Sequence, residues 1–187
     1  GWYYSGSNTK VVPKTSADDS NPSHVQFYSS TTKMEMLQDA VNGFIEQAAK
    51  KNDALSDTNK QSRISLVKFA GEKKNTVGND VYGPYNRNYT QIVSEYKAYT
   101  TAEGESDRTK LQELVNALKP AGATSADYAM DLAKQLVSPK TPSNNDALNP
   151  RENAKKIVIF FTDGEPNHQN GFDRDVANDA ITSAKGI

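Results

Sequence analysis

Residues 155–167 read KKIVIFFTDGEPN, and this stretch decides the class of fold. The five consecutive apolar residues Ile157 to Phe161 are typical of a strand that is buried on both faces of a parallel sheet. The run stops at Thr162-Asp163-Gly164, where the sequence favours a turn. Ligands of open α/β sheets bind beyond the carboxyl ends of the strands, so the carboxylate of Asp163 is predicted to project at a binding edge. On these residues alone, Asp163 could equally cap its own turn through an Asx-type hydrogen bond.

The elements around this strand are predicted from hydrophobic periodicity and capping residues. A helix is expected over residues 32–51, because apolar residues recur there at spacings of three and four and Thr32 and Glu35 match a capping box. Residues 64–69, in RISLVKFAG, predict a short strand that ends at Gly71. Further helices are expected to begin near Ser106, near Thr124 or Ser125, and near Phe172.

Helices that alternate with buried strands indicate an α/β fold. We therefore expect a three-layer, doubly wound, mostly parallel sheet with helices on both faces. Only two strands are firm, and two strands are too few to form a sheet that is covered on both faces. The expected fold is thus incomplete at both ends, with flanking strands outside residues 1–187, one of them beside Ile157–Phe161.

The chain of 187 residues suits one domain, residues 1–187. Residues 1–31 are expected to form a polar loop or insertion, with a possible short strand at His24–Tyr28. Residues 72–105 hold little apolar material and are interpreted as a second insertion, with room for a hairpin or a short helix. The tyrosines of that segment could form a contact surface or pack onto the body of the domain: Tyr82, Tyr85, Tyr89, Tyr96 and Tyr99.

Composition narrows the class of function. The 22 basic and 23 acidic residues give a net charge of −1, so neither nucleic acid nor an anionic membrane is the expected partner. The absence of cysteine excludes thiolate catalysis, cysteine-bound zinc and disulfides. No apolar run approaches the ~20 residues that span a bilayer, so direct membrane insertion is not expected. A polar, tyrosine-rich chain without cysteine favours an extracellular bacterial module.

Thr124 is the second candidate site residue. The segment Gly122-Ala123-Thr124 places a hydroxyl at a helix start, beside a glycine that lets the backbone approach a ligand closely. Taken alone, Thr124 is more simply explained as a helix N-cap. A hydroxyl and a carboxylate on neighbouring loops also suit a hard cation such as Mg²⁺.

Three more charged residues carry weaker signals. His168 lies near the predicted binding edge and is expected to be a solvated loop histidine. Asp127 and Asp131 stand four residues apart on one predicted helix and are interpreted as a solvated face.

Together these segments resemble the von Willebrand factor type A domain, also called the integrin I-like domain. The resemblance rests on four segments, KMEMLQDAVNGFIEQ, RISLVKFAG, LKPAGATSADYAMDLA and KKIVIFFTDGEPN, and it covers most of residues 32–187. The style of these segments is most similar to type A domains of Gram-positive surface and pilus proteins. The combination of the FTDGEP strand end with the GAT loop is more specific than either piece alone.

The resemblance implies a metal-ion-dependent adhesion site. Thr124 and Asp163 would be its metal residues, and Mg²⁺, or alternatively Mn²⁺ or Ca²⁺, its cofactor. The family also carries a leading Asp-x-Ser-x-Ser, and Tyr3-Tyr4-Ser5-Gly6-Ser7 has both serines but a tyrosine in place of the aspartate. Either the site is degenerate at Tyr3, or the complete pattern lies upstream of Gly1.

The expected function is that of a divalent-metal-dependent binding module in a bacterial cell-surface, cell-wall or pilus protein, and not of an enzyme. Its expected partners are an extracellular protein ligand, such as a host matrix or cell-surface protein, and other domains of the same surface protein. One alternative is a structural pilus or stalk domain with a degenerate metal site. A weaker alternative is a Mg²⁺-dependent phosphoryl hydrolase that uses Asp163 as its nucleophile.

Overall fold

The computed structural model describes residues 9–11, 27–29, 32–83, 87–102, 106–138, 148–162, 164–169 and 171–187. By their internal contacts these residues form two units, Gly1–Ala40 and Val41–Ile187. In the first unit, β1 (Thr9–Val11) and β2 (Phe27–Ser29) pair in an antiparallel ladder with Thr9 opposite Ser29. Strand β2 overlaps the end of the short strand expected at His24–Tyr28, whose first three residues lie outside the described residues, and its partner β1 lies in a segment expected to be loop.

Helix α1 (Lys33–Asp53) begins in the first unit and continues into the second. Its start is the predicted capping box: Thr32 N–H donates to Glu35 Oε2 at 2.6 Å, and Glu35 N–H donates to Thr32 Oγ1 at 3.1 Å. The remaining helices are α2 (Ser106–Asn116), α3 (Ala126–Val137) and α4 (Arg174–Lys185), with a short 3₁₀ turn at Thr58–Lys60. All four predicted helices are confirmed.

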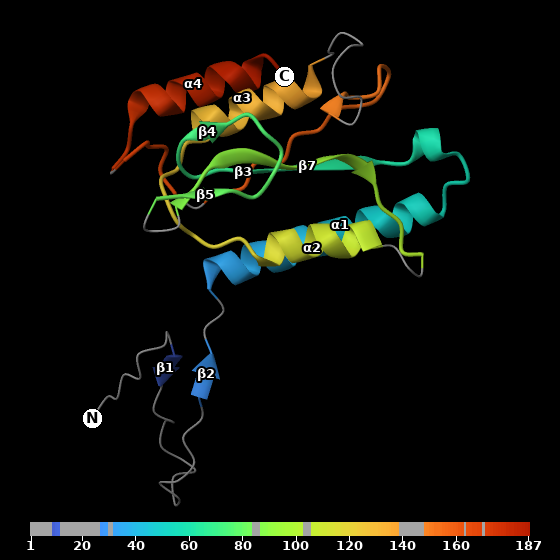
Figure 1. Ribbon diagram of the computed structural model, residues 1–187, viewed down its shortest axis with the longest axis horizontal. Helices are drawn as coiled ribbons and strands as arrows, with labels where there is room; N and C mark the ends of the chain where they lie inside the picture. Colours follow the sequence, from blue (N-terminus) through green and yellow to red (C-terminus); the bar gives the residue numbers. More distant parts are fainter. Residues whose placement is uncertain are drawn as a thin grey trace, which may run out of the picture. The chain divides into compact units, whose positions relative to one another are not determined.

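The largest sheet of the second unit has three strands in the order β3-β7-β4 (Figure 1). Strand β3 (Arg63–Lys68) pairs antiparallel with β7 (Thr90–Ala98), and β4 (Lys73–Lys74) pairs parallel with β7. A separate antiparallel pair joins β5 (Val81–Tyr82) and β6 (Arg87–Asn88). The fold thus contains helices and a small mixed sheet, whereas the sequence indicated a larger and mostly parallel one.

The hydrophobicity pattern does not predict strand β7, because residues 90–98 belong to the expected insertion at 72–105. Its first four residues are buried, and Thr90 and Gln91 are fully shielded from solvent. Of the tyrosines in this segment, Tyr99 is buried in the core and Tyr96 is partly buried. The rings of Tyr82 and Tyr89 contact each other at a tilt of 42°, with centroids 4.6 Å apart. Tyr85 lies outside the described residues.

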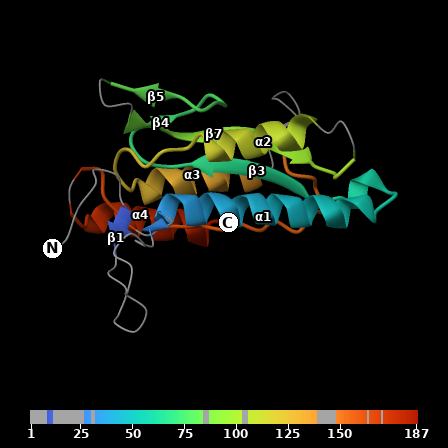
Figure 2. The same ribbon diagram turned by 90° about the horizontal axis from the view of Figure 1, so that it is seen from below.

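The core consists of two apolar clusters that lie on opposite faces of β3, since successive side chains of a strand alternate. Ile64 and Leu66 pack against the first cluster, on the face covered by α1 and α2. This cluster consists of Ile45, Ala49, Tyr99, Leu111 and Val115. Val67 packs against the cluster of Ile92, Leu132 and Leu136, on the side of α3. In Figures 1 and 2 helices accordingly lie on both faces of the sheet, with α4 beside α3.

Segment 157–161, expected to be a buried strand, is the main departure from the sequence-based prediction. The structure assigns no strand to these residues. Ile157 is 69% exposed, and Ile159 and Phe161 are each about half exposed, at 51% and 50%. The ring of Phe160 stacks on that of Phe69, just after β3, with centroids 4.9 Å apart. The prediction of burial is therefore wrong for this chain, because no described strand pairs with the segment.

None of the described helices is long and apolar enough to cross a membrane.

Candidate functional site

The loop before α3 and the loop after segment 157–161 meet at one place. Thr124 and Asn167 form an isolated antiparallel bridge, in which Thr124 N–H donates to the Asn167 carbonyl at 3.2 Å and Asn167 N–H donates to the Thr124 carbonyl at 3.0 Å. These are the two loops that carry the predicted site residues. The structure thus brings the Thr124 loop and the residues just after Asp163 together.

Gly164 lies directly against the Thr124 side chain. A Cβ built on Gly164 would stand 2.6 Å from Thr124 Oγ1, closer than such atoms approach in real structures. Only a glycine therefore leaves the hydroxyl in its present position. Asp163 itself lies outside the described residues, as do Tyr3, Ser5 and Ser7, so their predicted roles stay predictions.

The neighbouring hydroxyls of Thr124 and Ser125 have different roles. Ser125 is buried, and its Oγ donates to the Ala70 carbonyl at 2.7 Å, which fixes the start of α3 to the end of β3. Ser125 is also the N-cap residue of α3, although its side chain makes no capping hydrogen bond. Among the described residues, the hydroxyl of Thr124 has no hydrogen-bond partner. Thr124 is therefore not the helix cap that the simpler interpretation required.

Gly122 allows this loop to approach β3. Its φ of +125° lies in a region that favours glycine, and a Cβ there would stand 2.9 Å from the Cβ of Ala70. Because the backbone can pass so close, Ser125 N–H also reaches the Ala70 carbonyl, at 3.2 Å. The glycine predicted to permit a close approach to a ligand thus permits a close approach to the protein itself.

His168 joins the second loop to the first turn of α3. Its Nε2 lies 3.1 and 3.0 Å from the two carboxylate oxygens of Asp127, and its ring meets that of Tyr128 edge-on, with centroids 4.6 Å apart. Asp131, one turn further along, pairs with Lys73 at 2.5 Å. His168 and Asp127 therefore bond each other, which the expectation of solvated residues did not include, whereas the side chain of Asp131 is paired but still 37% exposed. The partners are distant in sequence, and no local pattern signalled them.

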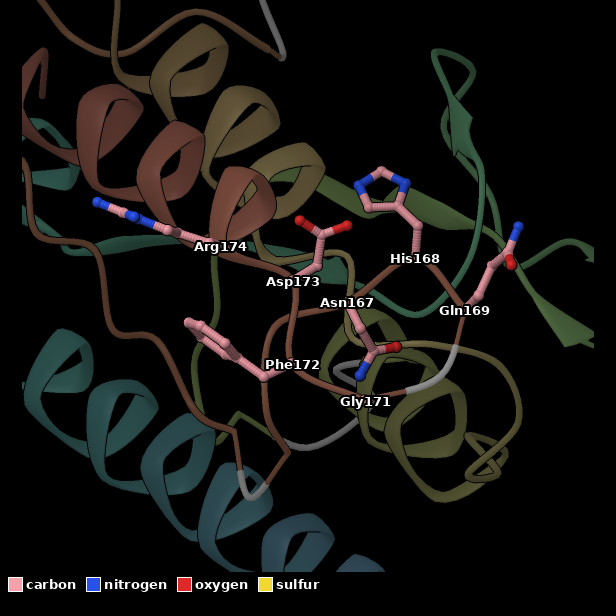
Figure 3. Close-up of a pocket in the computed structure, with 7 residues that line it drawn as sticks. All are labelled: Asn167, His168, Gln169, Gly171, Phe172, Asp173 and Arg174. Atoms are coloured by element: carbon pink, nitrogen blue, oxygen red, sulfur yellow. The ribbon is translucent and has the colours of Figure 1, made fainter.

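Two cavities flank these loops, and His168 and Gln169 line both. One, of about 450 Å³, is bounded also by Tyr82, Arg87, Gly122 and Ala123. The other, of about 380 Å³, is bounded by residues 167–169 and 171–174. Figure 3 shows that the side chains around this second cavity point in different directions rather than toward a common centre. Asp173 is already used as the N-cap of α4, with its Oδ1 accepting from the N–H groups of Asp175 and Val176.

Whether a cation can bind beside Thr124 depends on which ligand atoms are available there. The hydroxyl oxygen of Thr124 is a ligand of the kind that hard cations prefer, and it is not engaged by another described group. In the described part of the chain, however, no three His, Asp or Glu side chains cluster in a way that could hold a metal ion. Among the described residues Thr124 thus offers one oxygen ligand and no metal-holding cluster stands beside it, so a metal site at Thr124 and Asp163 stays a prediction.

Comparison with known proteins identifies the family. The model of the von Willebrand factor type A domain matches residues 28–186. No curated protein and no solved structure gives a significant match. Domains of this type are generally metal-dependent adhesion or protein-interaction modules, and they commonly bind a divalent metal at a metal-ion-dependent adhesion site. Since the match covers most of the 187 residues, the chain belongs to the von Willebrand factor type A domain family.

Proposed function

We propose that this chain is a divalent-metal-dependent adhesion module of a bacterial cell-surface, cell-wall or pilus protein. Thr124 and Asp163 contribute oxygen ligands to Mg²⁺, for which Mn²⁺ or Ca²⁺ can substitute. A carboxylate of an extracellular protein ligand, such as a host matrix protein, completes the coordination. The module makes and breaks no covalent bond.

One observation carries this proposal: the Thr124 hydroxyl lies against Gly164, the residue after Asp163, and has no other described partner. A hydroxyl at a helix start normally caps the helix, but here the adjacent Ser125 holds the N-cap position. Thr124 is therefore available to a ligand at the edge where Asp163 is predicted to project.

In the proposed site, the residues of this chain position the ligand atoms and contribute little negative charge. Thr124 is neutral, and its backbone bridge to Asn167 holds the two loops together. A bound cation supplies the electrophilic centre that attracts the ligand's carboxylate. Because Thr124 adds no negative charge, Asp163 would be the only anionic residue of this pair, which favours an anionic ligand from the partner.

The test uses the full-length protein, with binding to an immobilised host matrix protein measured in Mg²⁺ and again in EDTA. Asp163→Ala should abolish the EDTA-sensitive part of the binding. The matched control is Asp175→Ala, which removes an exposed carboxylate from the first turn of α4 and should leave binding unchanged.

Two results would contradict the proposal. EDTA-sensitive binding that survives in Asp163→Ala would show that another site holds the metal. Absence of heat on titrating Mg²⁺ or Mn²⁺ into the folded full-length protein would favour a structural stalk domain with a degenerate site.

A further inference from the structure

The cavity of about 450 Å³ is enclosed by three segments that are distant in the sequence: the β5–β6 pair, the loop before α3 and the loop after segment 157–161. Each segment contributes two lining residues, in this order: Tyr82 and Arg87, Gly122 and Ala123, and His168 and Gln169. Part of the insertion expected at residues 72–105 thus forms one wall of a cavity beside the Thr124 loop.

The β5–β6 pair is fixed to the body of the domain by Asn88, which is only 9% exposed. Its N–H donates to the Ala121 carbonyl at 3.0 Å, and its Nδ2 donates to the Lys119 carbonyl at 2.6 Å. Its own carbonyl accepts from Gly71 N–H at 3.0 Å. Tyr82 packs against the same glycine, since a Cβ on Gly71 would collide with the tyrosine hydroxyl. This wall therefore has a defined position relative to the loop before α3.

The other two walls are fixed as well. Ser125 holds the loop before α3 to the end of β3, and the bridge between Thr124 and Asn167 holds the two loops together. The imidazole of His168 is held through its bond to Asp127. The cavity thus exists before a ligand arrives, and a preformed site loses less conformational entropy on binding.

Hydrogen-bond donors dominate the lining. Arg87 is exposed and brings a full positive charge, with its N–H donors in a planar fork. None of the six lining residues is an aspartate or a glutamate. The N–H groups of Gly122 and Ala123 donate to no other described group, and Gln169 adds an exposed amide. The lining therefore favours an anionic ligand.

The arrangement of donors suits a carboxylate. The fork of one guanidinium pairs with the two oxygens of one carboxylate. A phosphate group carries up to two charges at neutral pH, and the lining has no lysine or second arginine to balance the second charge. The volume of about 450 Å³ leaves room for chain on either side of an acidic side chain. The backbone N–H groups and the amide of Gln169 can bond the peptide groups of that chain.

We propose that this cavity binds an acidic side chain in a peptide segment of a partner protein, and that it does so without a metal ion. Arg87 pairs with the carboxylate, while Gln169 and the Gly122–Ala123 backbone bond the flanking peptide groups. The inference goes beyond the proposed function, because the residues of this cavity include neither Thr124 nor Asp163.

The test uses the full-length protein in EDTA, so that a metal site plays no part. The probe is the blocked peptide acetyl-Gly-Glu-Gly-amide, and its neutral counterpart acetyl-Gly-Gln-Gly-amide is the control ligand. Saturation-transfer NMR detects weak binding of small peptides to a large protein. The glutamate peptide should bind, and the glutamine peptide should bind about tenfold more weakly, because it forms no ionic hydrogen bond.

Two variants distinguish the cavity from general surface charge. Arg87→Gln removes the guanidinium from an exposed position and should weaken binding of the glutamate peptide about tenfold. Ala123→Phe keeps every charge but fills the cavity, and it should weaken binding as much. The matched control is Arg174→Gln: Arg174 is also exposed, but it lines the other cavity, toward α4 (Figure 3), and its loss should leave binding unchanged. If Ala123→Phe fails to fold, the comparison of the two arginine variants decides.

Three results would overturn the inference. Equal binding of the two peptides would show that the charge is not recognised. Unchanged binding in Arg87→Gln would show that the carboxylate binds elsewhere. Tighter binding of the same peptide with phosphoserine in place of glutamate would assign the cavity to phosphate. Because every measurement is made in EDTA, these outcomes leave the proposed metal-dependent function to its own test.

Discussion

Thr124 Oγ1 lies 2.6 Å from the point that a Cβ on Gly164 would occupy. The other Thr124 atoms near that point, Cβ and Cγ2, are at an ordinary contact distance of 3.6 Å. An added methyl group would thus clash with the hydroxyl oxygen and make only ordinary contacts with the other two atoms. Rotation about χ1 of Thr124 can relieve this contact, and the hydroxyl would then leave the position in which it faces the loop after Asp163.

Gly164→Ala should therefore impair metal binding more than folding. We expect loss of Mg²⁺-induced stabilisation, which thermal unfolding with and without Mg²⁺ would measure. Gly43→Ala is the matched control, since a Cβ there meets nothing within 4 Å in the middle of α1. The control should raise the free energy of unfolding by about 0.5–1 kcal/mol, because alanine is the better helix former. Full Mg²⁺ stabilisation in Gly164→Ala would contradict the placement of Thr124 in the site.

Thr124→Ala and Ser125→Ala should have opposite effects, although the residues are adjacent. Thr124→Ala removes a hydroxyl that stabilises no described group, so Mg²⁺ binding should be lost while metal-free stability stays within about 0.5 kcal/mol. Ser125→Ala removes a buried hydrogen bond to Ala70 and should cost about 1 kcal/mol of stability with Mg²⁺ binding retained. Calorimetry and denaturant unfolding of both variants test the pair. Equal losses of stability would mean that Thr124 is structural.

The helices could be predicted because each has an apolar stripe and a start signal within a few residues. In α1, for instance, Thr32 and Glu35 are three residues apart and bond each other directly. Strand β7 could not be predicted in this way, since its buried positions include Thr90 and Gln91, whose side chains are satisfied by partners far along the chain. A strand with polar residues at its buried positions lacks the apolar pattern from which strands are predicted.

The same distinction applies to the site. Thr124 could be singled out because Gly122 and the helix start are adjacent to it in the sequence. The bond between His168 and Asp127 spans 41 residues and depends on how the two loops meet. Only the three-dimensional structure reveals it, and with it the correct interpretation of Asp127.

Asp80 should make stability sensitive to acid. Its Oδ2 accepts from Lys74 Nζ at 2.8 Å and from Gln91 Nε2 at 2.7 Å, and these bonds, that of Lys74 first, hold the pKa of the carboxyl below its ordinary value. A pKa that is lower in the folded state means that the unfolded chain binds protons first as pH falls. The contribution of Asp80 is therefore complete above about pH 4 and is lost at lower pH.

Asp80→Asn should accordingly flatten the fall of stability between about pH 4 and pH 2, and it should lower stability at neutral pH. Urea unfolding across this pH range measures both effects. Asp39→Asn, which removes an exposed carboxylate of α1, serves as the control. If Asp80→Asn and Asp39→Asn changed the pH profile equally, the bonds to Lys74 and Gln91 would not be the cause.

Segment 157–161 should be protected from solvent in the full-length protein and unprotected in residues 1–187 alone. Exposed Ile157, Ile159 and Phe161 in a segment that pairs with no described strand are an aggregation hazard, and a run this apolar is typical of a strand inside a sheet. We therefore expect residues 1–187, expressed alone, to aggregate and to gain no stability from Mg²⁺. Ile159→Lys should improve the solubility of residues 1–187 but destabilise the full-length protein, because a charge would replace a side chain that a neighbouring strand covers. Hydrogen exchange of the amides of 157–161 in both proteins tests this directly. Fast exchange in the full-length protein, or a soluble, monomeric and Mg²⁺-stabilised chain of residues 1–187, would show that the segment needs no further strand.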